Sequence, residues 1–549
     1  MAVAAGLILY LNRGTTFFLD ELAWVYDSPN LSGAGDVLEP HNGHLIATSR
    51  LVYKAILEVF GAEYVVFRVV AVLTVVLSAG VFYALVKRRI GALPALAPAL
   101  VLLFLGSAWQ HVVIPVGFTV IFSIAAGLAA LLALERDDRR GDVAACALLV
   151  LSVATYTTGL AFLVGVAISV LIRGDRRRRA WIFLVPLVLY AAWWVWALGS
   201  AASAEDEAHP SNILVIPNYV AESLATTLAA IVGLDYDFSE LSPPAAELGW
   251  GRVLAVLAVI AFAFRLRRGA VPRALWVSLG IVLAYWTLGA LAASGERGPG
   301  ATRYVYPGVV AVLLVAVDAV RPLRVSRLGL LALFAAAAFS VATNLAILRN
   351  GVVYFRDDYS AAVRSELAML ELARANVAPD FNPANRLPPE IAPVGAPATT
   401  YLGARDRYGS PAFSLGELSE QTEGVREGAD QVLATALGLR LEPSPPGERG
   451  RACRRLRSAA PGGTVRLPVP PGGASLRVAA VAPPSVSVGR FGGVSTAEVG
   501  SLSPGETAAL RIPPDASSTP WHVSVTGVES VTVCPLRPGA GSAQGQAIG

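Results

Sequence analysis

The sequence predicts a polytopic α-helical membrane protein of about 11 transmembrane helices, followed by a mainly β domain outside the cytoplasm. Three observations lead to this fold class. The 549 residues are 54% hydrophobic and only 15% charged, whereas soluble globular chains carry roughly 25% charged residues. Apolar stretches long enough to cross a bilayer recur between residues 1 and 348, and basic clusters separate them. The chain then changes to short alternating runs divided by Pro and Gly.

The apolar stretches define the individual helices, since a membrane-spanning helix needs about 20 apolar residues. Spans are expected at 64–86, 91–109, 113–134, 180–198, 250–264, 274–293, 304–320 and 328–348. The longer run 143–172 is interrupted by "TYTTG" and is basic at both ends. It predicts a hairpin of two shorter helices that turns at Tyr156–Gly159. Residues 1–11 predict a short or truncated helix that is retained, because a basic n-region and a cleavage site are both missing before Asp20.

The basic clusters predict the orientation of these helices. They occur at 87–89, 136–140, 173–179, 265–273 and 321–327, and the connections between them alternate with loops poor in Lys and Arg. Because basic loops stay in the cytoplasm, the connections 12–63 and 199–249 are expected outside. Everything after about residue 349 is then extracytoplasmic as well. The net charge of +4 comes from these orientation signals and gives no indication of a nucleic-acid partner.

The chain after residue 349 is expected to have three parts. Residues 349–440 form a helical and linker region, residues 441–538 a β-sandwich-like domain, and residues 539–549 a disordered tail. Cys453 precedes the first strand-like run and Cys534 ends the last one. If those runs are neighbouring strands, a disulfide would join the two cysteines in an oxidising compartment. Cys146 lies in an apolar span and is interpreted as a core residue.

The first outer loop carries two pairs of chemically capable residues. Asp20 and Glu21 are expected just after the C-terminus of the first helix, where the helix dipole does not favour carboxylates. Such a position suits a general base or a metal ligand. His41 and His44 would share one helical face if "PHNGHL" opens a helix, and imidazoles bind phosphate, metals or carboxylates. Ordinary solvated loop residues are the alternative interpretation of both pairs.

A second candidate region is the connection "SGERGPGATRYVYP" between the spans 274–293 and 304–320. Arg297 and Arg303 lie on the outer side against the orientation rule, and a guanidinium there can hold a phosphate with two hydrogen bonds. Tyr304 and Tyr306 could stack on a sugar or belong to an interfacial aromatic belt. Asp235-x-Asp237 and the carboxylates of "FRDDYS" at 355–360 are weaker candidates. Nucleotide-binding motifs are absent from the sequence, so nothing indicates that ATP drives the protein.

Together, "FFLDELAW", "HNGHLIATSRLVYK" and "ATRYVYP" give residues 1–350 an arrangement that resembles the GT-C superfamily of membrane glycosyltransferases. The resemblance is to the protein mannosyltransferase and aminoarabinose transferase type. It implies a multi-pass plasma-membrane enzyme that takes a sugar from a polyprenyl-phosphate carrier. The sugar would go to an extracytoplasmic glycan, lipid or protein acceptor.

The resemblance also implies roles for the candidate residues. Asp20 or Glu21 would deprotonate an acceptor hydroxyl, which then attacks the anomeric carbon with inversion. Arg303 would stabilise the leaving phosphate, and Arg297, a histidine or a divalent cation such as Mg²⁺ or Mn²⁺ would assist it. The lipid tail would lie near the hairpin 143–172. The histidine pair departs from the best-known branches of the superfamily, and the sequence does not rank Asp20 against Glu21.

Two other functions are kept as alternatives. A lipid-linked glycan ligase or polymerase uses a similar donor, but the adjacent Asp20 and Glu21 suit it less. A flippase or transporter would place polar residues at mid-membrane. The expected spans are almost free of charged residues, and Asp318 lies near a cytoplasmic end. Sugar, acceptor, linkage and metal dependence do not follow from the sequence.

Overall fold

The structure, a computed structural model, describes residues 1–174, 176–200, 210–234, 248–267, 271–294, 297–321, 326–444, 452–460 and 462–536. It divides into two compact units, Met1–Phe355 and Arg356–Gly549. The expected disordered tail 539–549 and the Asp235-x-Asp237 pair lie outside the described residues.

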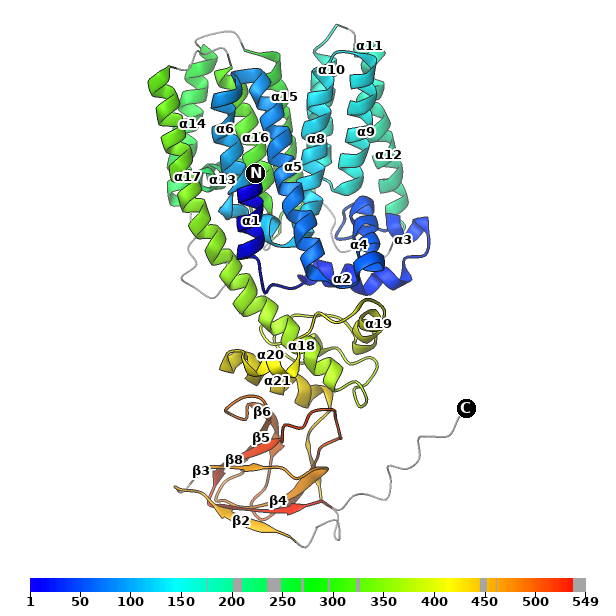
Figure 1. Cartoon of the computed structure of the whole chain (residues 1–549), viewed down its shortest axis with the longest axis vertical. Helices are drawn as coiled ribbons and strands as arrows, with labels where there is room; N and C mark the ends of the chain where they lie inside the picture. The colour runs from blue at the N-terminus through cyan, green and yellow to red at the C-terminus, as the bar shows by residue number, and fades with distance from the viewer. Residues whose placement is uncertain are drawn as a thin grey trace. The chain divides into compact units, whose positions relative to one another are not determined.

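The first unit is a helical bundle (Figure 1). Its first half contains α1 (Ala2–Leu11), α2 (Leu19–Asp27), α3 (Ala34–Leu38), α4 (Ala47–Phe60), α5 (Tyr64–Ile90), α6 (Ala92–Leu103), α7 (Trp109–Val113) and α8 (Phe118–Leu134). Its second half contains α9 (Arg139–Thr155), α10 (Gly159–Leu171), α11 (Arg176–Arg179), α12 (Trp181–Ala197), α13 (Ile216–Val232), α14 (Gly249–Arg267), α15 (Arg273–Leu291), α16 (Thr302–Val320) and α17 (Arg327–Tyr354). Short 3₁₀ turns lie at η1 (Ser28–Asn30), η2 (Gly106–Ala108), η3 (Pro115–Gly117) and η5 (Pro210–Val215).

Among the described residues, 7 helices are long and apolar enough to cross a membrane. An eighth span results if α6 is joined to Gly106–Val113, from which it is bent by 41°. Three further apolar helices, α1, α10 and α12, are shorter. The chain is therefore a polytopic helical membrane protein, as its composition predicts. The span expected at 91–109 is not continuous, because α6 ends at Leu103.

The expected hairpin within 143–172 is confirmed. α9 ends at Thr155 and α10 begins at Gly159. Ser123 of α8 donates to the carbonyl of Ser152 at 2.9 Å and to that of Tyr156 at 3.2 Å, which satisfies the open end of α9. A Cβ at position 159 would lie 2.7 Å from the carbonyl carbon of Ser152, so glycine permits the close return of the chain.

The basic clusters meet at one end of the bundle. Arg89, at the end of α5, pairs with Asp318 near the end of α16 at 2.6 Å. Arg265 of α14 donates to the carbonyl of Ala319 at 2.7 Å. Arg179 pairs with Asp137, just beyond the end of α8, at 2.6 Å. The helices α2, α3 and α4 lie at the opposite end from α11 (Figure 1). The basic clusters therefore lie at one end of the bundle, and the helices of the first outer loop lie at the other end.

The connection 199–249, which the sequence predicts to lie outside, contains the helix α13. α13 packs against α14, α15 and α16. Side chains of α17 donate to the last carbonyls of α13: Asn344 to Ala230 at 3.0 Å, Thr343 to Val232 at 2.6 Å, and Ser340 to Ile231. The sequence signal was weak because α13 includes Asn, Glu, Ser and Thr and is the least apolar of the candidate spans.

The second unit begins with the helices α18 (Ala361–Leu372), α19 (Ala398–Tyr408), α20 (Leu415–Ser419) and α21 (Glu423–Ala436). Nine strands follow among the described residues: β1 (Leu441–Pro443), β2 (Arg454–Arg457), β3 (Gly463–Pro468), β4 (Gly473–Ala479), β5 (Ser485–Gly489), β6 (Ala497–Ser501), β7 (Thr507–Arg511), β8 (His522–Val528) and β9 (Ser530–Pro535). They form two antiparallel sheets, ordered β1-β7-β4-β9-β2 and β3-β8-β5-β6. The expected mainly β character of this region is confirmed.

The expected disulfide joins the edge of the first sheet. Arg454 is opposite Val533 in the β2–β9 pair, which puts Cys453 opposite Cys534. The two cysteines are bonded, with their Cα atoms 4.2 Å apart. In the same unit, the buried carboxylate of Asp430 on α21 accepts backbone hydrogen bonds from Arg490, Phe491 and Gly492 at 2.8–2.9 Å. These bonds fasten α21 to the loop after β5.

Candidate active site

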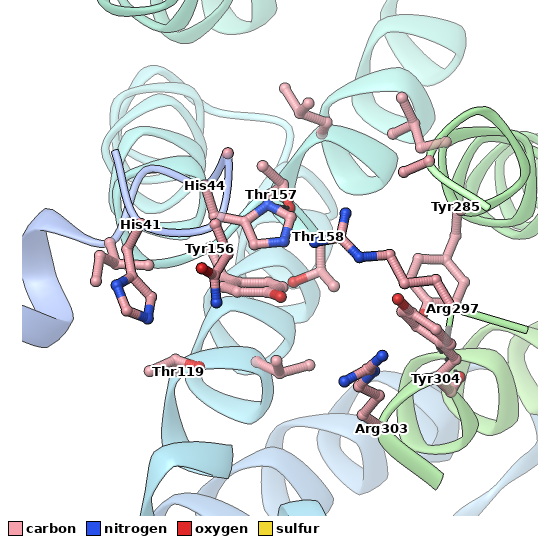
Figure 2. A pocket seen from close by; sticks show the side chains of 18 of the residues that line it. His41, His44, Thr119, Tyr156, Thr157, Thr158, Tyr285, Arg297, Arg303 and Tyr304 are labelled. Atoms are coloured by element: carbon pink, nitrogen blue, oxygen red, sulfur yellow. Dashed lines mark hydrogen bonds between the residues drawn. The ribbon is translucent and has the colours of Figure 1, made fainter. Parts of the chain in front are cut away.

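A cavity of about 710 Å³ lies in the first unit, away from the basic end. Residues from α2, α7, α12, α13, α15, α16 and the α9–α10 turn line it. Figure 2 shows His41, His44 and Tyr156 on one side and Arg297, Arg303 and Tyr304 on the other, with Thr157 and Thr158 between them. Most of the predicted site residues therefore meet in this one cavity, although they come from segments more than 200 positions apart.

Asp20 and Glu21 lie in the first turn of α2, which corrects the expected position. α1 ends at Leu11, and the chain is extended before a new helix starts at Leu19. The N-terminal end of a helix carries partial positive charge, so the dipole favours both carboxylates. The sequence suggested an unfavourable position for the two carboxylates, but their observed position is favourable. The role of each carboxylate depends on what it contacts.

Glu21 points into the protein and is fully buried. Its carboxylate accepts a hydrogen bond from Tyr53 at 2.6 Å, from the backbone N–H of Phe18 at 2.8 Å and from Tyr64 at 3.4 Å. Burial, only partly offset by these bonds, raises the pKa of Glu21 to about 8. Glu21 is not among the residues that line the cavity. It joins α2 to α4 and α5.

Asp20 lines the cavity, and its side chain is 43% exposed. Nε2 of His41 lies 3.4 Å from Oδ1 of Asp20, where it can donate to the carboxylate. Burial pushes the pKa of Asp20 up, but the hydrogen bond and charge of His41 and the charge of Arg303 hold it below its ordinary value. Asp20 is therefore an ionised carboxylate at neutral pH, and it faces open space.

His41 and His44 do not lie on a helix, contrary to the expectation. Each backbone N–H bonds to the other's carbonyl, at 3.1 and 2.9 Å. Asn42 and Gly43 between them have φ of 49° and 74°. An Asn-Gly pair with two positive φ angles is typical of a tight two-residue hairpin turn. The turn brings both imidazoles to the same cavity.

The α9–α10 turn supplies residues that the sequence interpretation did not assign to the site. Nδ1 of His44 shares a hydrogen bond with Oγ1 of Thr157 at 3.0 Å, and its ring lies 4.5 Å from that of Tyr156. Thr158 donates to Ser123 at 3.0 Å and also lines the cavity. The signal in the sequence is the polar interruption "TYTTG" within an apolar run. It predicts the turn, but it was not interpreted as part of the site.

The arginine side of the cavity comes from the segment before α16 and its first turn. Arg297, Arg303 and Tyr304 line the cavity as expected. Tyr306 is fully buried in α16 and is not among the lining residues. Tyr304 and Tyr306 lie on different faces of α16, because successive residues are about 100° apart around the helix axis.

α7 adds Gln110 and His111 to the cavity, and neither was proposed from the sequence. The hydroxyl of Thr302 donates to the side-chain oxygen of Gln110. His111 is 6% exposed, and its Nδ1 has no hydrogen-bond partner among the described residues. His111 could have been selected from the sequence, because an ionisable residue at membrane depth is a functional candidate by default.

Among the described residues, no group of three or more His, Cys, Asp or Glu side chains comes together in a way that could hold a metal ion. Asp20 and His41 are near one another and could supply at most part of a metal shell.

No protein-family model matches the chain, and no curated protein matches it. Two solved structures resemble it. ArnT from Cupriavidus metallidurans bound to undecaprenyl phosphate has a TM-score of 0.43 and 13% identity, over 69% of this chain and 81% of that one. The same protein in the apo state has a TM-score of 0.46 and 13% identity, over 76% and 89%. At this level of similarity neither structure assigns a residue of the cavity.

Proposed function

We propose that the chain is an inverting membrane glycosyltransferase. It moves a sugar from a polyprenyl-phosphate carrier to a hydroxyl of an extracytoplasmic acceptor, with Asp20 as the general base. One observation carries this proposal. The ionised carboxylate of Asp20 and its partner His41 border the same cavity as two guanidinium groups, and Figure 2 shows His41 across from Arg297 and Arg303. Displacement at an anomeric carbon needs a base on one side and stabilisation of a leaving phosphate on the other.

The proposed reaction is a single displacement at the anomeric carbon of the donor sugar. The acceptor hydroxyl gives its proton to Asp20 while its oxygen forms a bond to the anomeric carbon. The bond from that carbon to the phosphate oxygen breaks, and its electron pair leaves on the polyprenyl phosphate. Arg303 and Arg297 stabilise the added negative charge. The proton later passes from Asp20 to water.

Asp20 suits the role of base better than Glu21 for two reasons. Asp20 borders open space, whereas Glu21 is enclosed by Tyr53, Tyr64 and the backbone of Phe18. Burial raises the pKa of Glu21 to about 8, so this carboxyl is mostly protonated at neutral pH and cannot accept a proton. The lowered pKa of Asp20 keeps it ready to accept one.

The cavity also has a wall that suits a lipid carrier. Trp194 of α12 and Leu198, which directly follows this helix, line the cavity, and each is 52% exposed. An isoprenoid chain could leave the cavity beside these side chains and enter the surrounding bilayer, while its phosphate stays with the arginines. This exit lies on α12, which packs against α9 and α10, the hairpin expected from the sequence to accommodate the lipid.

The test compares two adjacent isosteric substitutions in the full chain, reconstituted in lipid nanodiscs. Donors are polyprenyl-phosphate sugars, and the acceptor is an envelope glycan fraction. Asp20→Asn should lower the release of polyprenyl phosphate by a factor of about 10² to 10⁴, because the base is lost. Glu21→Gln mimics the protonated side chain and should stay within about tenfold of the unmodified protein. Near-native transfer by Asp20→Asn would contradict the assignment of the base. Donor uptake without any transfer would favour a flippase.

A further inference from the structure

A second, smaller cavity of about 190 Å³ lies beside the first one. Its lining comes entirely from the first outer loop and includes Trp24, Asp27, Asn30, Glu39, Arg50 and Tyr53. Trp24 lines both cavities. The proposed reaction uses none of the other five residues, so the second cavity has no role in the chemical step.

One face of α2 connects the base to the second cavity. Asp20, Trp24 and Asp27 are spaced i, i+4 and i+7, which places them on the same side of the helix. At 1.5 Å per residue, Asp27 lies about 10 Å along the helix from Asp20. A molecule with a hydroxyl at Asp20 can therefore extend past Trp24 toward Asp27.

Trp24 has an unused hydrogen-bond donor. Its side chain is 5% exposed, and its indole N–H has no hydrogen-bond partner among the described residues. The ring itself is held edge-on by Tyr53, with centroids 4.9 Å apart, and by His41, with centroids 5.5 Å apart. A buried N–H without a partner destabilises the folded protein. A ligand that accepts this hydrogen bond would remove that destabilisation.

The charges of the second cavity determine what it can hold. Arg50 is used within the loop, because its Nη1 donates to the carbonyls of Asp36 at 2.7 Å and Glu39 at 2.5 Å. The carboxylate of Asp36 is also used, since it accepts from the backbone of Ser32 and Gly33 at 2.8 and 2.9 Å. The carboxylates of Asp27 and Glu39 border the cavity and give it an acidic character. An anionic ligand would be repelled.

We propose that this second cavity binds a neutral saccharide unit of the acceptor, one or more sugars away from the hydroxyl that reacts at Asp20. Sugar hydroxyls would donate to Asp27, Glu39 and the side-chain oxygen of Asn30, and one hydroxyl oxygen would accept from Trp24. The apolar face of the sugar ring would pack against the part of Trp24 that borders the cavity. The proposal rests on the proposed function for its orientation, and it makes the acceptor a glycan rather than a protein or a free lipid.

The experiment measures saccharide binding and donor-side binding separately, on the full chain in detergent micelles. Saccharide binding is followed by saturation-transfer NMR with the neutral disaccharides mannobiose and galactobiose, and with digalacturonic acid as an anionic probe. Farnesyl phosphate, measured by calorimetry, probes the arginine side. The variants are Trp24→Phe, which removes only the N–H and part of the ring, and the double change Asp27→Asn with Glu39→Gln. Glu58→Gln on α4 is the matched control, because it removes a carboxylate of the same loop that does not line either cavity.

The expected result is binding of at least one neutral disaccharide, and at least fivefold weaker binding in both cavity variants. Glu58→Gln should bind like the unmodified protein, and farnesyl phosphate should bind all variants equally, which also shows that they are folded. Unchanged disaccharide binding in both cavity variants would overturn the proposal, as would preferential binding of digalacturonic acid. If the unmodified protein binds a disaccharide but does not bind farnesyl phosphate, the result contradicts the proposed donor. The saccharide site would still be supported by that result.

Discussion

At the scale of single residues, the neighbours Asp20 and Glu21 have opposite environments. Successive residues of a helix point about 100° apart, so the first turn of α2 presents one carboxylate to the cavity and the other to α4 and α5. Asp20 contacts His41, whereas Glu21 contacts Tyr53 and Tyr64. One carboxylate is therefore suited to chemistry and the other to holding the loop on the bundle.

The contact between His41 and Asp20 predicts a pH effect. A base works when it is ionised, so transfer should be lost as the pH falls through the pKa of Asp20. His41→Gln removes the charge that lowers this pKa, and burial then raises it. The acid limb of the pH–rate profile should therefore move to higher pH, which steady-state assays between pH 4 and 8 would measure.

The control is His44→Gln, because His44 bonds to Thr157 rather than to Asp20. This variant can lower the rate but should leave the acid limb in place. If both histidine variants keep the limb of the unmodified protein, His41 does not set the ionisation of the base.

Residue types were easier to predict than residue geometry. Asp20, His41, His44, Arg297, Arg303 and Tyr304 were selected from the sequence because polar groups at the edges of apolar runs are unusual. The turn at Asn42–Gly43 could have been predicted, since Asn-Gly favours two positive φ angles. The burial of Glu21 and Tyr306 could not, because it depends on helices that pack from elsewhere in the chain.

At the scale of elements, the sequence predicted the α9–α10 hairpin and the Cys453–Cys534 bond but not the break after α6. The hairpin signal is local, because a polar interruption lies between two basic flanks. The disulfide was predicted from the position of one cysteine at each end of a strand series, although the two are 81 positions apart. The break after α6 and the end of α13 depend instead on Asn344 of α17, which is far from both in sequence. Asn344 accepts from the backbone and side chain of Ser107 at 3.1 and 3.2 Å. It also donates to Ala230 and Ser340 at 3.0 Å each.

This bonding predicts that Asn344→Leu is strongly destabilising. Leucine is similar in size but can neither accept from the N–H and hydroxyl of Ser107 nor donate to the carbonyls of Ala230 and Ser340, so four buried hydrogen bonds are lost. Each buried hydrogen bond contributes about 0.5–1.5 kcal/mol, so the apparent melting temperature in detergent should fall by several degrees. Asn350→Leu, at an exposed position of the same helix, is the control and should have little effect. Equal melting temperatures for the two variants would contradict the role of Asn344.

At the scale of the whole molecule, the bundle has a basic end and a cavity end. The ends of α5, α8, α14 and α16 meet through Arg89, Asp318, Arg265 and Arg179. The cavity end carries Asp20 and the histidine turn. Since basic loops remain in the cytoplasm, the cavity is proposed to face outward. The disulfide at Cys453–Cys534 agrees with an extracytoplasmic second unit, because such bonds persist in oxidising compartments.

α13 is the element on which this orientation depends. Just before it, Asn212 donates to the carbonyls of Leu291 and Ala293 at the cavity-side end of α15. The last turn of α13 bonds to Ser340 and Asn344, near the middle of α17 rather than at its end. We therefore expect α13 to enter from the cavity side and not to cross the membrane completely, which keeps Gly249 on the outer side.

Reporter fusions test this topology. Alkaline phosphatase, which is active only outside the cytoplasm, should be active when fused after Gly249 or Gly549 and inactive when fused after Arg179. Activity of an equivalent cytoplasmic reporter at Arg179 is the control for expression. If α13 crosses the membrane completely, the side of every later helix end is reversed, and phosphatase would be inactive at all three positions. If phosphatase is active at Arg179 and inactive at Gly549, the cavity faces the cytoplasm and Asp20 cannot serve an extracytoplasmic acceptor.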